Sequence, residues 1–414
     1  MKLARRWVAA GAVLLAALLL AFWFRPGGQG LGSGQPAGGA EPAAPATQLG
    51  KSLDDLLAAG QRAQTSASYQ DTKVEVCGYG VFDARTDERA IEALGERLDG
   101  QSLDVLRRAG LRLATRADVN ERAVGLWAQF AAELSSWMSS DAYKEQSAGQ
   151  TRLPMPPPVT RPLSELIRLA ADSGSPTVYR LALSGCLDWG LKPTVCNSIS
   201  WTTLAELEPD NAGNWLQVAG QAQLRGDTAA WDDAMRRAIA APRHRVGVLY
   251  ASGTLATAME GLAEPALQQS ALVRTIGIEA MLSVPQNAVF AASRWCPEPQ
   301  RQALSAARQK ECAALGQRLQ QSDDITLAWS GYGIQGRFAS GEAERAQIKA
   351  QSDALQRARL KQAEQEVGAS LMSCAGIAAT RARLQRVAQI GEAGVAREAL
   401  AREAQAAKPA APPR

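Results

Sequence analysis

Two sets of residues recur along the chain with a spacing of 34 residues, and this period constrains the fold more than any other feature of the sequence. The large members are Leu181, Trp215 and Leu249, and the small members, four positions later, are Gly185, Ala219 and Gly253. In a pair of packed helices, a large apolar residue fills the interface, and a small one a turn later lets the second helix approach closely. A fixed period of this length is typical of stacked helical hairpins. The sequence therefore predicts a mainly α-helical fold.

The middle period has the clearest internal pattern. A turn, a first helix, a second turn and a second helix are marked in order by Pro209, Asp210, Asn211, Trp215, Gly226, Asp227 and Ala238. This pattern resembles a tetratricopeptide repeat. The resemblance covers about residues 176–262 and is strongest over 208–242, and it implies an α–α superhelix. Generic helical hairpins remain the alternative interpretation.

The two flanking periods follow the pattern less closely. Before the middle unit, a loop bounded by Cys186 and Cys196 replaces the tight turn between the helices. After it, Pro265 falls where the interior of a second helix is expected, and proline in a helix interior removes a hydrogen bond.

The resemblance also implies a binding surface. Tetratricopeptide repeats hold their partners in a concave groove lined by the first helix of each unit, which here implies Gly213, Leu216, Gly220 and Gln223. An apolar side chain, an accessible backbone and an amide suit an extended peptide. The alternative is that the C-terminal helices of the same chain cover this face, because the residues after the last unit must pack somewhere.

One uncharged run, from Trp7 to Phe24, is long enough to cross a bilayer. Three bases, Lys2, Arg5 and Arg6, precede it, so we expect the N-terminus in the cytoplasm and the body in the periplasm, anchored to the inner membrane. A cleavable signal peptide is the alternative. It requires a site of small residues directly after the run, where large aromatic residues stand instead.

Composition and spacing divide the rest of the chain. The predicted segments are a cytoplasmic stub and anchor (1–25), a flexible Gly/Pro/Ala-rich stalk (26–50), an N-terminal helical domain (51–140), a Pro-rich linker (141–162), the repeat region (163–322), C-terminal helices (323–407) and a disordered tail (408–414). In the N-terminal domain we expect at most one short β segment, near 72–77, and an apolar helical stripe from Val119 to Trp137.

The net charge of +4 does not indicate a nucleic-acid partner. The chain has 45 basic and 41 acidic residues, and the four bases of residues 1–25 account for the whole excess. Because the remaining body is neutral, no basic surface for phosphate binding is expected.

Six cysteines in an exported body predict disulfides. A short segment with Gly190 and Pro193 can fold back between the first pair, and prolines can bend the chain between the second. Other connectivities stay open. The favoured pairs are Cys186–Cys196, Cys296–Cys312 and, by elimination, Cys77–Cys374.

No cofactor or metal site and no catalytic set of residues is predicted. The chain has no Cys-x-x-Cys motif and one histidine, His244, which we expect at the surface between two arginines. Gly331, Gly333 and Gly336 match a dinucleotide-binding spacing without the strand that it requires, so we expect a flexible turn there.

Three function classes follow. The first is a membrane-tethered periplasmic scaffold that binds an envelope protein or peptide. The second is an envelope enzyme, for example a helical glycan-cleaving hydrolase with a buried glutamate as general acid. The third is a structural assembly subunit that oligomerises through the Ala-rich face of a long helix at 342–371.

Overall fold

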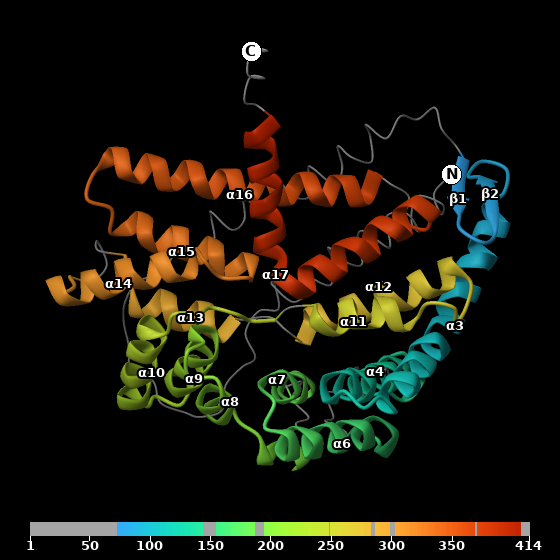
Figure 1. Cartoon of the computed structure of the whole chain (residues 1–414), viewed down its shortest axis with the longest axis horizontal. Coiled ribbons are helices and arrows are strands. Elements are labelled where there is room, and N and C mark those ends of the chain that lie inside the picture. The colour runs from blue at the N-terminus through green and yellow to red at the C-terminus, as the bar shows by residue number, and fades with distance from the viewer. Residues whose placement is uncertain are drawn as a thin grey trace, which may run out of the picture.

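The computed structural model describes residues 73–143, 155–186, 194–247, 249–282, 286–298, 303–368 and 371–406, which form a mainly helical body (Figure 1). In chain order the elements are β1 (Lys73–Val76), β2 (Gly80–Asp83), α3 (Glu88–Ala114), α4 (Val119–Met138), α6 (Pro157–Ser173), α7 (Pro176–Gly185), the 3-10 helix η1 (Thr194–Ser198), α8 (Trp201–Leu207), α9 (Ala212–Leu224), α10 (Thr228–Ala240), α11 (Tyr250–Ala258), α12 (Pro265–Leu282), α13 (Gln286–Trp295), α14 (Ala306–Leu319), α15 (Ile325–Arg337), α16 (Glu342–Gly368) and α17 (Cys374–Ala406).

The β segment expected near 72–77 is one half of a hairpin. β1 pairs antiparallel with β2, with Val74 opposite Phe82. The sequence prediction of at most one strand was too low, because Gly78 and Gly80 both adopt positive φ and let the chain reverse within three residues.

The largest core joins the N-terminal helices to the middle of the chain. The predicted stripe lies on α4, where Trp127, Phe130 and Leu134 are fully or almost fully buried against α3, α6 and α7. α11, α12 and the first half of α17 pack on the same core, to the right in Figure 1. The N-terminal helices and part of the region predicted to contain repeats therefore share one hydrophobic core.

The linker predicted over 141–162 is helical in its last part. α6 begins at Pro157, with two prolines at its first positions, where a missing N–H costs no intrahelical hydrogen bond. Met155 and Val159 are buried, so this segment belongs to the core. Pro265 likewise stands at the first position of α12 and not in a helix interior.

A second core lies between α9, α10, α13, α14 and α15. The rings of Trp231 and Trp295 meet edge to face with centroids 5.4 Å apart. The guanidinium of Arg308 lies 3.4 Å from the centre of the Trp295 ring. The glycines at 331, 333 and 336 are within α15, whose Leu327, Ala328 and Ile334 supply a buried face, so the expected turn there was wrong.

The long helix α16 is used within the chain. Leu355 and Ala358 are buried in a third cluster with residues of α15 and α17. These two of the apolar positions that we considered for oligomer formation are therefore occupied by intramolecular packing.

Three disulfides join the pairs favoured from the sequence, Cys77–Cys374, Cys186–Cys196 and Cys296–Cys312. The first links the turn of the β hairpin, directly after β1, to the first residue of α17, 297 residues later. Disulfides persist in oxidising compartments, which indicates an extracytoplasmic location for the body.

Other expectations concern residues outside the described ranges. They are the anchor at Trp7–Phe24, the stalk at 26–50 and the tail at 408–414. In the part of the chain that is described, none of the helices is both long and apolar enough to span a bilayer.

Candidate functional site

The expected groove on α9 is closed by the chain itself. Gly213, Leu216 and Gly220 are all buried, and Leu216 has no exposed surface. α13 covers this face so closely that a Cβ atom on Gly220 would lie 2.6 Å from the Asn287 carbonyl oxygen. Three of the four predicted partner-binding residues are therefore core residues, and only Gln223 reaches a pocket.

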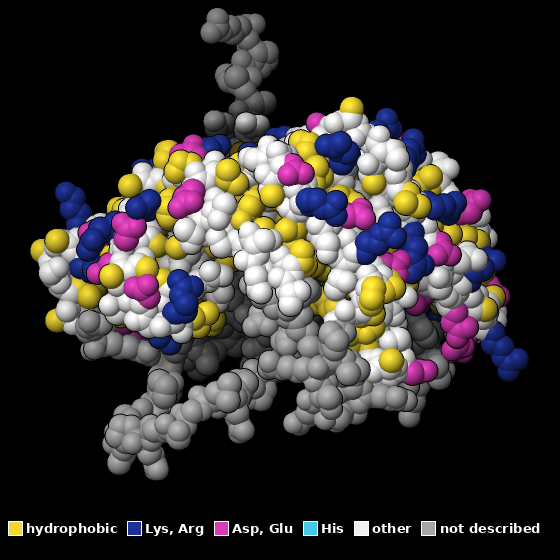
Figure 2. Space-filling view, turned by 90° about the horizontal axis from the view of Figure 1, so that it is seen from below, with side chains coloured by type: hydrophobic (Ala, Val, Ile, Leu, Met, Phe, Trp, Pro, Cys, Tyr) yellow, Lys and Arg dark blue, Asp and Glu magenta, His cyan; other side chains and the backbone are white. Residues whose placement is uncertain are grey.

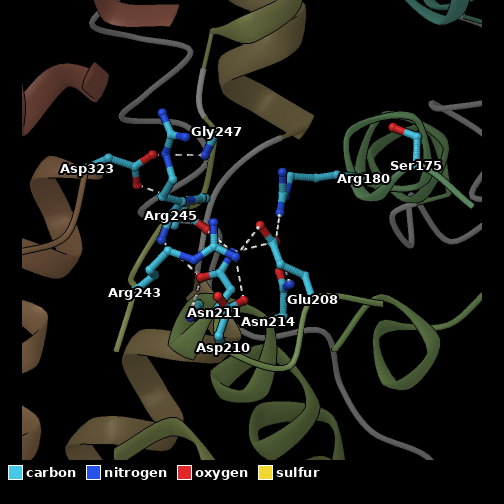
Figure 3. Close-up of polar contacts among 12 residues, drawn as sticks. Ser175, Arg180, Glu208, Asp210, Asn211, Asn214, Arg243, Arg245, Gly247 and Asp323 are labelled. Carbon is cyan, nitrogen blue, oxygen red and sulfur yellow. Dashed lines mark hydrogen bonds and ion pairs between the residues drawn. The ribbon is translucent and has the colours of Figure 1, made fainter. Parts of the chain in front are cut away.

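The turn before α9 forms a polar junction, which we define as Arg180, Glu208, Asn211, Asn214, Arg243, Arg245 and Asp323 (Figure 3). Asn211 occupies its centre. Its Nδ2 donates to Glu208 Oε2 over 2.7 Å and to the Arg245 carbonyl over 2.9 Å. Its Oδ1 accepts from the backbone N–H groups of Gly213 at 3.1 Å and Arg245 at 2.9 Å. The side-chain amide is thus fully hydrogen-bonded on both its atoms.

Glu208 accepts several hydrogen bonds on the other side of the junction. Its Oε2 accepts from Arg180 Nη2 at 2.6 Å and from Asn214 Nδ2 at 3.1 Å, in addition to the bond from Asn211. Arg243 Nη2 lies 3.7 Å from Oε1 and also pairs with Asp210. A carboxylate surrounded in this way is held by the protein's own donors and stabilises the junction.

Asp323 connects the junction to the C-terminal helices. Its carboxylate accepts from the backbone N–H groups of Val246 at 2.7 Å and Gly247 at 3.2 Å. Burial raises the pKa of Asp323, and these bonds oppose that rise. Gly391, with φ of 74°, packs directly on Asp323 at the kink of α17, where a side chain would clash.

Two further buried carboxylates stabilise helix N-termini. Glu279 on α12 accepts from the backbone N–H groups of Ala251 and Ser252 at 2.9 and 2.8 Å, at the start of α11. Asp324 is the N-cap of α15 and accepts from Leu327 N–H at 2.8 Å. Burial raises the pKa of Glu279 to about 6 and that of Asp324 to about 7. Both groups hold helix ends, where a negative charge is favoured.

His244 is buried and not at the surface as predicted. Its side chain is 7% exposed, and desolvation lowers its pKa to about 4, so the ring is neutral at physiological pH. The prediction failed because the flanking arginines point to other partners: Arg243 pairs with Asp210, and Arg245 Nη2 donates to the Gln389 carbonyl. Neither ring nitrogen has a hydrogen-bond partner among the described residues.

A pocket of about 620 Å³ lies at the other end of α9, by the turn into α10 and the C-terminal ends of α13 and α15. Its lining includes Gln223, Gly226, Asp227, Trp231, Ser293 and Arg294. Asp227 is the N-cap of α10 and accepts from Ala230 N–H at 3.0 Å. The pocket therefore combines an aromatic ring, an amide and a guanidinium.

Exposed apolar side chains occur on the two helices beside this pocket. Leu224, the last residue of α9, is 76% exposed, and Phe290 on α13 is 61% exposed. On the face seen in Figure 2, basic, acidic and apolar side chains are interspersed, and neither sign of charge gathers into one patch. The sequence did not single out Leu224, Phe290 or Arg294, because exposure of an isolated apolar residue is not readable from spacing.

The described residues contain no group of three or more His, Cys, Asp or Glu side chains placed to hold a metal ion. Comparison with models of known protein families finds no match, and none is found among curated proteins or solved structures.

Proposed function

We propose that this protein is a membrane-tethered scaffold of the cell envelope, whose helical body, built around a tetratricopeptide-like unit, binds a protein partner in the periplasm. The anchor would be the run at Trp7–Phe24, held in the inner membrane. The three disulfides support an oxidising compartment for the body.

The observation that carries the binding proposal is the pocket at the α9–α10 turn together with Leu224 and Phe290. Large exposed apolar side chains beside a pocket are typical of surfaces that bind other proteins. The side chains of Asn211 and Glu208 in the polar junction already have hydrogen-bond partners within the chain. We therefore assign the partner-binding surface to the end of α9 that lies at this pocket.

The two alternative classes have less support. Glu279 and Asp324 have raised pKa values, but each holds a helix N-terminus and neither lines the pocket. Leu355 and Ala358 of α16 are packed within the chain. Binding is thus the function that the geometry favours over acid–base catalysis or assembly through α16.

Site-specific photocrosslinking in intact envelopes tests this proposal. A photoreactive phenylalanine analogue replaces Leu224 or Phe290 in the full-length anchored chain. The control places the analogue at Leu111, which is 58% exposed and lies on α3, far in sequence from positions 224 and 290. We expect one discrete crosslinked product from positions 224 and 290 and none from position 111. Equal crosslinking from all three positions, or from none, would refute the proposed binding end.

A further inference from the structure

The two exposed apolar residues lie on α9 and α13, which both contribute lining residues to one pocket. Gly220 touches Asn287, and one turn later Gln223 lines the pocket together with Ser293 and Arg294. Leu224 shares the face of Gly220, four positions away, and Phe290 shares the face of Asn287, three positions away. Leu224 is thus next in sequence to the lining residue Gln223, and Phe290 lies one turn before the lining residues Ser293 and Arg294.

Arg294 extends this face on α13, four residues after Phe290. No hydrogen bond or ion pair joins its side chain to another described residue, and it is exposed. Arg225, next to Leu224, is exposed as well, and no side-chain contact ties it to another residue of the described ranges. These two guanidinium groups are available to a partner.

The other charges at the pocket are already engaged. Asp227 caps α10, where the helix N-terminus stabilises its charge. Arg337 Nη1 donates to the Cys296 carbonyl at 2.9 Å, and Glu298 also interacts within the protein. Arg294 is therefore the charged lining residue that has no hydrogen bond or ion pair with another described residue, and its guanidinium complements a carboxylate.

We propose that this pocket binds an extended segment of the partner protein in which an apolar side chain stands beside a carboxylate. The apolar side chain packs between Leu224 and Phe290, and the carboxylate pairs with the Arg294 guanidinium. Gln223 donates or accepts a hydrogen bond with the backbone of the segment. This inference rests on the proposed binding function and adds the chemistry of the segment.

Defined peptides test the inference with the full-length chain reconstituted in lipid nanodiscs. Three labelled twelve-residue peptides share an Ala/Ser background and carry Leu-Glu, Leu-Gln or Leu-Lys at their centre. We expect fluorescence anisotropy to give at least tenfold tighter binding of the Leu-Glu peptide than of the Leu-Lys peptide. Equal affinity for all three, or no binding of any, overturns the inference.

Charge reversal supplies the decisive comparison. In Arg294→Glu we expect the preference to invert, so that the Leu-Lys peptide binds more tightly. The matched control is Arg345→Glu, an exposed arginine on α16 outside the pocket, and it should keep the original order. The same order in both variants contradicts the role of Arg294.

Apolar contact is tested in the same assay. Phe290→Ser should weaken binding of the Leu-Glu peptide at least fivefold, whereas Leu111→Ser should leave it unchanged. Crosslinking from position 224 to a second copy of this chain would also overturn the inference, because the occupant would then be the protein itself. If position 224 captures a partner in envelopes but the peptides show no charge preference, the inference fails and the proposed function stands.

Discussion

Asn211 and Arg245 lie 34 residues apart in the chain and exchange two hydrogen bonds of 2.9 Å, between the Asn211 side-chain amide and the Arg245 backbone. Their separation equals the period of the repeat. The turn that begins α9 is thus tied to the segment 34 residues later, and Asp323 accepts hydrogen bonds from the next two residues of that segment. Asn211 therefore helps to join the start of α9 to the segment that follows α10.

Replacing Asn211 should weaken the body substantially. Asn211→Ala removes all four bonds of the buried amide and leaves Glu208 and the Arg245 backbone with fewer partners. We expect a loss of about 3 kcal/mol in the free energy of unfolding, measured by urea denaturation. Asn197→Ala, at an exposed position of η1, should change it by less than about 0.5 kcal/mol. Similar small effects from both changes would contradict the central role of Asn211.

The contact between α9 and α13 predicts opposite effects for two Gly→Ala changes. At Gly220 the new Cβ would meet the Asn287 backbone, so we expect a loss of about 2 kcal/mol or more. Gly100, within α3, has open space around its Cβ position, so Gly100→Ala should stabilise the body by up to about 1 kcal/mol. Thermal unfolding of both variants gives the comparison, and a neutral Gly220→Ala would show that α13 does not close this face.

The raised pKa of Glu279 predicts that this residue makes the free energy of unfolding fall as the pH rises. Its pKa is about 6 in the folded protein and 4.5 ordinarily, so between these values the folded state holds a proton that the unfolded state has lost. The free energy of unfolding is therefore unaffected by Glu279 ionisation below pH 4.5 and falls by about 2 kcal/mol as the pH rises from 4.5 past 6.

Glu279→Gln should remove this component. His244, with its pKa lowered to about 4, acts in the opposite direction below pH 6.5, but it is present in both proteins. The difference between the two pH profiles, from urea denaturation at pH 4.5 to 7.5, therefore isolates Glu279. Parallel profiles would contradict the buried, protonatable carboxylate.

The disulfide between Cys77 and Cys374 closes the longest loop of the three and should stabilise the body most. In the loop-entropy model the double variant Cys77→Ser/Cys374→Ser loses about 6 kcal/mol, against about 3 kcal/mol for the double variant Cys186→Ser/Cys196→Ser. Urea denaturation of the two double variants under non-reducing conditions gives the order. A larger loss from the shorter loop would contradict it.

Local signals in the sequence were sufficient where a helix depends on its own residues. Asp227 before α10 and the apolar face of α4 predicted those helices, and the structure has them. The short loop between Cys186 and Cys196 likewise favoured a disulfide that the structure contains.

Features that depend on distant segments were not predictable from the sequence. The sequence places Leu216 in a groove, but in the structure α13, 70 residues further on, covers it. The sequence suggests an exposed His244 between two arginines, but in the structure the loop before α15 packs on the His244 backbone. The pocket also needs α9, α10, α13 and α15 together, and no single helix shows it. Spacing identifies faces of helices, but tertiary packing decides which of them remain open.

The most direct test compares two leucines on α9 by introducing the same charge at each. Leu224→Glu, at an exposed position, should leave the melting temperature within about 2 °C of the wild type and abolish crosslinking from position 290 in envelopes. Leu216→Glu, at a buried position, should unfold the body or lower the melting temperature by more than about 10 °C. If Leu224→Glu keeps full crosslinking while Leu216→Glu stays folded and loses it, the partner binds the groove on α9 and not the pocket beside Leu224, which contradicts the proposed binding end.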